Sequence, residues 1–71
     1  MGNGEISEGR RFYLNRSAEQ DVGTARDAGW MDPMRAAYYY ERAAQTYSRL
    51  GQHEKARELR SHVDDINHHC R

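Results

Sequence analysis

Apolar residues in the second half of the chain recur at helical spacing. Between residues 33 and 50 they alternate steps of four and three, at Ala36, Tyr40, Ala43, Tyr47 and Leu50. A second run follows between residues 53 and 68, at Ala56, Leu59, Val63 and Ile66. This spacing places apolar side chains on one face of an α-helix. The pattern therefore predicts two amphipathic helices, over residues 33–50 and 53–68.

Local signals for helix ends agree with these two segments. Asp32-Pro33 is typical of a helix start, because Asp caps free N–H groups and Pro fits the first helical turn. Gly51 is expected to end the first of the two helices in the left-handed conformation that glycine tolerates. Only two residues separate the segments, so the sequence predicts an antiparallel helical hairpin.

The first thirty residues carry a weaker pattern. Ser17 and Gln20 have the spacing of a capping box, and Ala18, Val22 and Ala25 form a thin apolar stripe after it. These residues predict a helix over 17–28, with Gly29 as its stop.

The residues before that helix are expected to be irregular. Residues 10–16 include Phe12, Tyr13 and Leu14, and we expect a short turn or an extended clip there. Residues 1–9 are rich in glycine and polar residues, which favours a disordered arm. The whole sequence thus predicts an all-α domain over residues 10–71, in which a short helix precedes the hairpin.

Composition narrows the classes of function. The 71 residues contain 11 basic and 11 acidic side chains, so the formal net charge is zero and no overall field attracts nucleic acid or an acidic membrane. No apolar run approaches the roughly 18 residues of a membrane span, so we expect no membrane partner. The one cysteine, Cys70, excludes an internal disulfide and agrees with a reducing cytoplasm, where we place the protein.

The hairpin resembles a single, degenerate tetratricopeptide repeat. The usual order of aromatic, small, aromatic, glycine and alanine residues falls on Tyr40, Ala44, Tyr47, Gly51 and Ala56. The sequence departs from that pattern at His53, Arg60 and Val63. Helical hairpins of other families, including the three-helix microtubule-interacting-and-trafficking type, are similar to it as well.

The resemblance implies a non-enzymatic protein-protein interaction module, an adaptor or an inhibitor, that binds a protein or a peptide. Repeats of this family stack on one another, and about three are needed for a stable array. We therefore expect an obligate partner, or a homodimer in which a second copy supplies the missing neighbour.

One face of the helix predicted over 33–50 combines arginine with tyrosine. Arg35, Tyr39, Arg42 and Arg49 share this face, Tyr38 adjoins it, and Trp30 stands at the preceding helix junction. Aromatic and Arg side chains dominate binding hot spots, so these six residues are the predicted partner-binding site. The alternative interpretation is an ordinary solvated face.

A second functional hypothesis uses the same face. Guanidinium and aromatic side chains also stack on bases and pair with phosphates, so the protein could be a small nucleic-acid-binding regulator. The zero net charge and the nearby acids Asp32, Glu41 and Glu54 make nucleic acid the less favoured partner.

Neither a metal site nor a catalytic site is predicted. His62, His68, His69 and Cys70 gather near the C-terminus, but they lack the paired spacings of zinc sites, and helix-face pairing explains them more simply. No nucleophile can be placed beside an oriented base, and no glycine-rich loop joins a strand to a helix. We therefore expect no enzyme activity and no cofactor.

Overall fold

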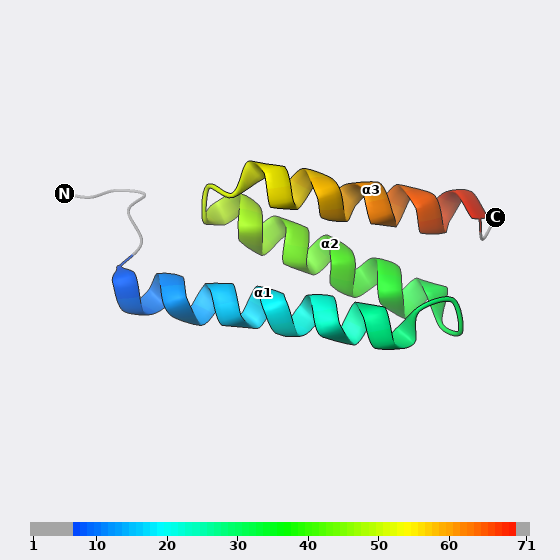
Figure 1. The fold of residues 1–71 in the computed structure, drawn as a ribbon, viewed down its shortest axis with the longest axis horizontal. Helices are drawn as coiled ribbons and strands as arrows, with labels where there is room; N and C mark the ends of the chain where they lie inside the picture. Colours follow the sequence, from blue (N-terminus) through cyan, green and yellow to red (C-terminus); the bar gives the residue numbers. More distant parts are fainter. Residues whose placement is uncertain (1–6, 70–71) are drawn as a thin grey trace.

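Three consecutive α-helices make up the part of the chain that the structure, a computed structural model, describes, residues 7–69. They are α1 (Glu8–Ala28), α2 (Pro33–Arg49) and α3 (His53–His69), and no strand occurs among these residues. Successive helices run antiparallel, and α2 lies between α1 and α3 (Figure 1). Both outer helices pack on α2 and not on each other. The predicted all-α, three-helix class is confirmed.

The N-terminal helix is longer than the sequence pattern predicted. α1 begins at Glu8, where the Ser7 side chain accepts a hydrogen bond of 3.3 Å from the Arg10 N–H. The predicted start at Ser17 is therefore wrong, because Ser17 lies in the middle of a continuous helix. The short turn or extended clip expected over 10–16 is wrong as well, since these residues are helical. Of the predicted arm, Glu8 and Gly9 are helical and Ser7 is the cap, and residues 1–6 lie outside the described part.

Packing against α2 accounts for the extra turns of α1. Leu14 packs against the core one turn before the buried Ala18, which extends the apolar stripe toward the N-terminus. The Arg11 guanidinium donates a hydrogen bond of 3.2 Å to the carbonyl of Leu50, at the C-terminal end of α2. This bond satisfies a carbonyl that the helix leaves free and places positive charge at the negative end of the helix dipole.

The α2–α3 hairpin follows the predicted bounds to within one residue at each end. Asp32 caps α2 by accepting from the Arg35 N–H, and Pro33 is its first residue. Gly51 has φ of 81°, and Gln52 N–H and Gly51 N–H donate to the carbonyls of Tyr47 and Ser48. This pair of bonds is the Schellman arrangement, so the expected role of Gly51 as the helix stop is confirmed. Gly29 likewise follows the last residue of α1 with φ of 51°.

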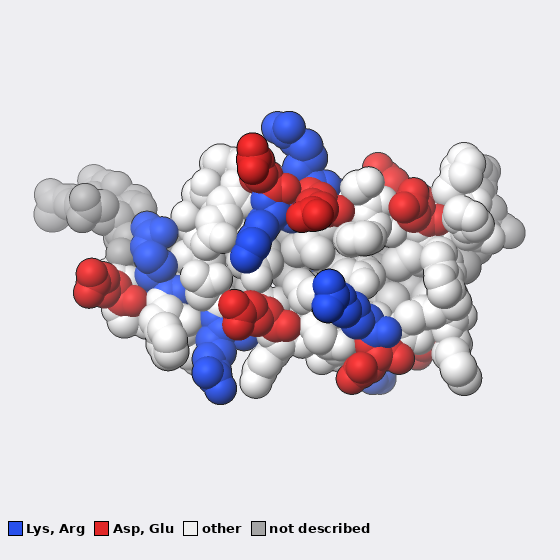
Figure 2. Space-filling view, viewed as in Figure 1, with Lys and Arg blue, Asp and Glu red and all other residues white. Residues whose placement is uncertain are grey.

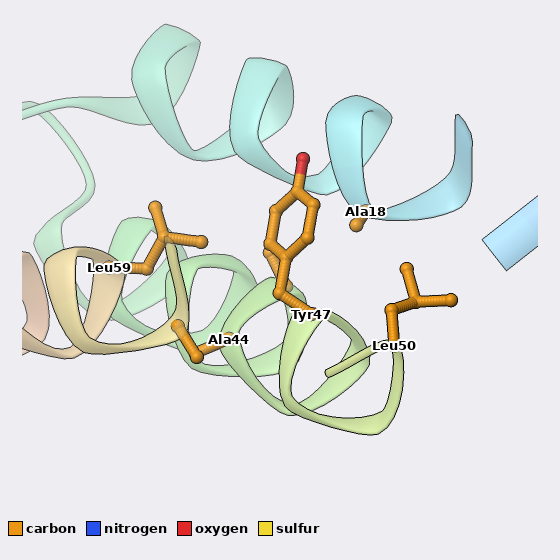
Figure 3. Packing of buried hydrophobic residues seen from close by; sticks show 7 residues of the cluster. Ala18, Ala44, Tyr47, Leu50 and Leu59 are labelled. Carbon is orange, nitrogen blue, oxygen red and sulfur yellow. The ribbon is translucent and has the colours of Figure 1, made fainter. Parts of the chain in front are cut away.

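The core combines small residues with two larger aliphatic ones around a single aromatic ring. Its buried members are Ala18, Ala43, Ala44, Tyr47, Leu50, Ala56 and Leu59. Figure 3 shows the Tyr47 ring directed from α2 toward α1, near Ala18. The alanines allow the helices to approach closely, and Tyr47 fills the space between them. Tyr47 therefore contacts both neighbours of α2 and is not confined to the α2–α3 hairpin.

Candidate functional site

The predicted arginine face of α2 is exposed, but one of its members is engaged within the chain. The exposed residues of α2 form one stripe, which we call the outer α2 stripe and which consists of Met34, Arg35, Tyr38, Arg42, Gln45 and Arg49. Arg42 Nε lies 3.5 Å from the Asp21 carboxylate of α1. The sequence did not predict this ion pair, because the two residues are far apart in the chain.

Asp21 is the most unusual charged residue of the described part. It is 9% exposed, and its Oδ2 atom is buried without a hydrogen-bond partner. Burial raises the pKa of the Asp21 carboxyl above its ordinary value, and the positive charge of Arg42 partly opposes that rise. A carboxylate in this position needs the nearby guanidinium, because desolvation penalises an uncompensated charge. Arg42 thus has a structural task in addition to its place on the stripe.

The other two arginines of the stripe, Arg35 and Arg49, are less engaged in contacts within the chain. Arg35 lies 3.7 Å from Asp32, the cap of the same helix, and both side chains are more than half exposed. An exposed pair of this kind contributes little to stability and is easily exchanged for another partner. For Arg49 no ion pair is found within residues 7–69.

The tyrosines of the predicted site differ in exposure. Tyr38 is 59% exposed, whereas Tyr39 is half-buried beside it. Their rings meet edge to face, with centroids 5.1 Å apart. Tyr38 therefore presents a large apolar surface to solvent, and Tyr39 helps to hold its orientation.

Trp30 lies on a different side of the molecule. Its ring lines a hollow of about 170 Å³ together with Ala36 and Tyr40, and it meets the ring of His69 edge to face at 5.6 Å. Tyr38 and Tyr40 are two residues apart, about 200° around the helix, so the sides that carry Trp30 and Tyr38 are nearly opposite. The structure thus separates Trp30 from the other predicted site residues.

A groove runs along α2 between the two outer helices. A hollow of about 390 Å³ has Tyr47 of α2 as its floor, and the 170 Å³ hollow continues it, since His62 lines both. The charged residues of the larger hollow have both signs and are Glu19, Arg26, Lys55 and Glu58. Sequence reasoning missed this groove because it depends on how α1 and α3 flank α2.

The aromatic floor of the groove is already covered by the chain itself. Lys55 Nζ lies 5.0 Å from the centroid of the Tyr47 ring, and His62 stacks on Tyr40 with ring centroids 5.1 Å apart. Burial raises the pKa of the Tyr47 hydroxyl, and the negative charge of Glu19 adds to that rise. The groove therefore offers a mixed-charge rim, and its large exposed apolar side chain is Trp30, which lines the 170 Å³ hollow.

Most of the large apolar side chains that reach solvent lie outside the groove, and Trp30 is the exception because it lines the 170 Å³ hollow. Exposed fractions between 59% and 95% are found for Phe12, Tyr13, Trp30, Met31, Met34 and Tyr38. Met31, Met34 and Tyr38 belong to the start of α2 and the residue before its cap. The sequence pattern identified Tyr38 and Trp30 but not the two methionines, which fall outside the helical stripe of the core. On the face shown in Figure 2, acidic and basic side chains are interspersed between uncharged regions.

Within residues 7–69 the chain has neither a metal-binding cluster nor a membrane-spanning helix. Within residues 7–69, no three His, Cys, Asp or Glu side chains are grouped so that they could hold a metal ion. None of the three helices described combines the length and the apolar character needed to cross a membrane.

Comparison with known proteins assigns the chain to no family. No protein-family model matches the chain, and neither a curated protein nor a solved structure matches it. The resemblance of the α2–α3 hairpin to a tetratricopeptide repeat stays a prediction.

Proposed function

We propose that the protein is a small protein-protein interaction module that binds its partner through the outer α2 stripe. The observation that carries this proposal is the exposure of Met34 and Tyr38 one helical turn apart, with Met31 exposed just before the helix. Large apolar side chains that gather on a surface mark sites of protein contact. As an adaptor or inhibitor, the protein needs no catalytic residue and no cofactor.

The stripe also indicates the chemistry of the partner. Its N-terminal half carries the apolar side chains of Met34 and Tyr38 beside Arg35. Its C-terminal half carries Arg49 and the partly engaged Arg42. A complementary segment would present apolar side chains to Met34 and Tyr38 and a carboxylate to Arg49. Methionine suits such a surface because its flexible thioether adapts to different apolar shapes. Arg35 can exchange its exposed contact with Asp32 for a carboxylate of the partner.

The outer stripe is a better candidate than the groove. The tyrosines on the groove floor are already covered by Lys55 and His62, so a ligand there would have to displace contacts within the chain. Tyr38 and Met34 have no such cover, and burying them removes apolar surface from water. The groove offers Trp30 alone as a large exposed apolar side chain, whereas the outer stripe offers Met34 and Tyr38 together, so a partner gains more free energy on the stripe.

Nucleic acid remains the alternative partner for the same stripe. The ion pair of Arg42 with Asp21 occupies one of the three arginines that this hypothesis needs. Binding to phosphates would weaken steeply as salt is added, because counterions are released on binding. Binding that depends on Met34 and Tyr38 would change little with salt.

The cytoplasmic location is part of the proposal and is supported by the single cysteine of the sequence.

Photo-crosslinking tests the proposal directly. A photoreactive amino acid is placed at Tyr38 or Met34 in the full chain, and at Arg57, exposed on α3, as the matched control. In extracts of the source organism, we expect one and the same protein to be linked from positions 38 and 34 but not from 57. Excess unlabelled parent chain should suppress the link, whereas a Met34→Ser/Tyr38→Ser chain should not. Equal labelling from Arg57, or equal suppression by the two competitors, contradicts the proposal.

A further inference from the structure

One exposed face of α1 carries an aromatic residue, Phe12, and a glycine in the helix interior, Gly23. Phe12 is 68% exposed, and Gly23 is exposed in the interior of the 21-residue helix. A Cβ atom added at Gly23 would meet nothing within 4 Å, so no contact inside the chain requires glycine there. Glycine in a helix interior costs about 1 kcal/mol relative to alanine. Close approach by a group outside the chain is a physical reason to retain it.

Two charged residues lie between Phe12 and Gly23 on the same side of the helix. Phe12, Arg16, Glu19 and Gly23 follow one another at steps of four, three and four, which places them on one helix face. All four are exposed, and neither Arg16 nor Glu19 belongs to an ion pair found within residues 7–69. We call this set the α1 outer face, which adjoins the groove because Glu19 and Gly23 also line the 390 Å³ hollow.

The order of these residues is self-complementary. Phe12 and Gly23 each lie about 8 Å along the axis from the midpoint between Ser17 and Ala18, and Arg16 and Glu19 flank the same midpoint. When a second α1 packs antiparallel about that point, Phe12 meets Gly23 of the second copy, and Arg16 meets Glu19 of the second copy. Phe12 of each copy then occupies the space beside Gly23 of the other copy, and the positive charge of Arg16 lies opposite the negative charge of Glu19.

We propose that the α1 outer face forms a homodimer of this chain by antiparallel pairing of two α1 helices. The arrangement is isologous, because each contact occurs twice under one twofold axis, and it closes after two copies. The outward side of α3 offers no comparable partner surface, since its exposed residues are all polar or charged. The dimer is independent of the proposed function and leaves the outer α2 stripes of both copies free for partners.

The contact is small, because it involves one pair of helices, so we expect self-association in the micromolar range. Sedimentation equilibrium of the full chain between micromolar and millimolar concentration measures it. Arg16→Glu alone and Glu19→Arg alone place like charges together and should each weaken the dimer at least tenfold. The double variant Arg16→Glu/Glu19→Arg restores opposite charges and should restore the dimer. Arg57→Glu, on exposed α3, is the control and should leave it unchanged.

The substitution Gly23→Gln distinguishes an effect on self-association from an effect on the stability of the single chain. Glutamine is a better helix former than glycine and has open space at this position in the single chain, so the thermal stability of the monomer should rise. In the dimer the added side chain occupies the place of Phe12 of the second copy, so self-association should fall at least tenfold. A parent chain that stays monomeric at millimolar concentration overturns the proposal. A dimer that persists in Gly23→Gln, or that the double charge exchange does not restore, overturns it too.

Discussion

At the scale of single residues, the pair formed by Asp21 and Arg42 joins stability to the candidate site. The buried Oδ2 atom of Asp21 accepts no hydrogen bond, and its one charged neighbour in the described residues is the Arg42 guanidinium of α2, 3.5 Å away. The sequence predicted Arg42 as a binding residue because its spacing matched that of Arg35 and Arg49. Spacing along one helix cannot reveal a partner on another helix. The exposed part of Arg42 can still contact a ligand, but its removal also affects the fold.

The first prediction concerns this pair. Arg42→Ala leaves the buried carboxylate without a counter-charge, so we expect the free energy of unfolding to fall by about 1–3 kcal/mol at pH 7. In an Asp21→Asn background the same substitution should cost much less, because no buried charge remains. Urea unfolding of the four chains measures the coupling between the two residues. Equal stability of Arg42→Ala and the parent at pH 7 would show that the pair contributes nothing.

The pH dependence of this effect has a definite sign. Burial raises the folded-state pKa of Asp21 above its ordinary value of 3.8, so the folded state favours the protonated form. The resulting contribution to stability is fully present below pH 3.8 and is lost as the pH rises through the raised pKa. Removal of Arg42 raises that pKa further. The destabilisation by Arg42→Ala should therefore be largest at neutral pH and should shrink as the pH falls toward 3.8.

At the scale of helices, the sequence predicted two elements well and one poorly. The ends of α2 and α3 follow from local signals, namely Asp32-Pro33 and Gly51, and a strong apolar period fixes the face of each helix. α1 lacks such a period, because its buried stripe consists mainly of alanine and includes the charged Asp21. Its first turns depend on Leu14 and on the bond from Arg11 to Leu50, which are tertiary contacts. The capping pattern at Ser17 therefore does not mark the start of α1, which is capped by Ser7.

Much of the candidate site could be predicted from the helical spacing of residues in α2. The exposed stripe of α2 is the complement of its apolar stripe, so Arg35, Tyr38 and Arg49 could be placed on it from spacing alone. The separation of Trp30 from Tyr38 and the groove floored by Tyr47 require knowledge of how α1 and α3 flank α2. Helix spacing contains no information on that arrangement.

Two glycines provide a matched test of the helix ends. Neither Gly51 nor Gly23 has an atom within 4 Å of an added Cβ, but Gly51 has φ of 81° whereas Gly23 is helical. Gly51→Ala should lower the free energy of unfolding by about 1 kcal/mol, because L-residues resist this conformation. Gly51→Val should lower it by more. Gly23→Ala should raise it by up to about 1 kcal/mol when measured at low concentration, where the chain is monomeric. Unchanged stability in both Gly51 variants would contradict the proposed role of the turn.

At the scale of the whole molecule, the arrangement of the helices determines which surfaces remain for partners. α2 is packed on both sides, and its one exposed stripe carries Met34 and Tyr38. α1 is packed on one side and leaves the face that carries Phe12 and Gly23. The chain has equal numbers of acidic and basic side chains, so neither surface depends on long-range attraction by a net charge. We therefore expect partner binding through α2 and self-association through α1 to be separable by substitution.

The binding footprint of the partner tests the central claim most directly. Amide hydrogen exchange of the chain is compared with and without the partner identified by crosslinking, at a concentration below that of self-association. We expect slower exchange on binding in α2 from Met34 to Arg42, and no change in α3. Tyr38→Ala should weaken the affinity by about 1–3 kcal/mol and leave the melting temperature unchanged. Slowed exchange confined to α3 and the groove side of α1, or a Tyr38→Ala chain that binds like the parent, would contradict the assignment of the outer α2 stripe as the binding surface.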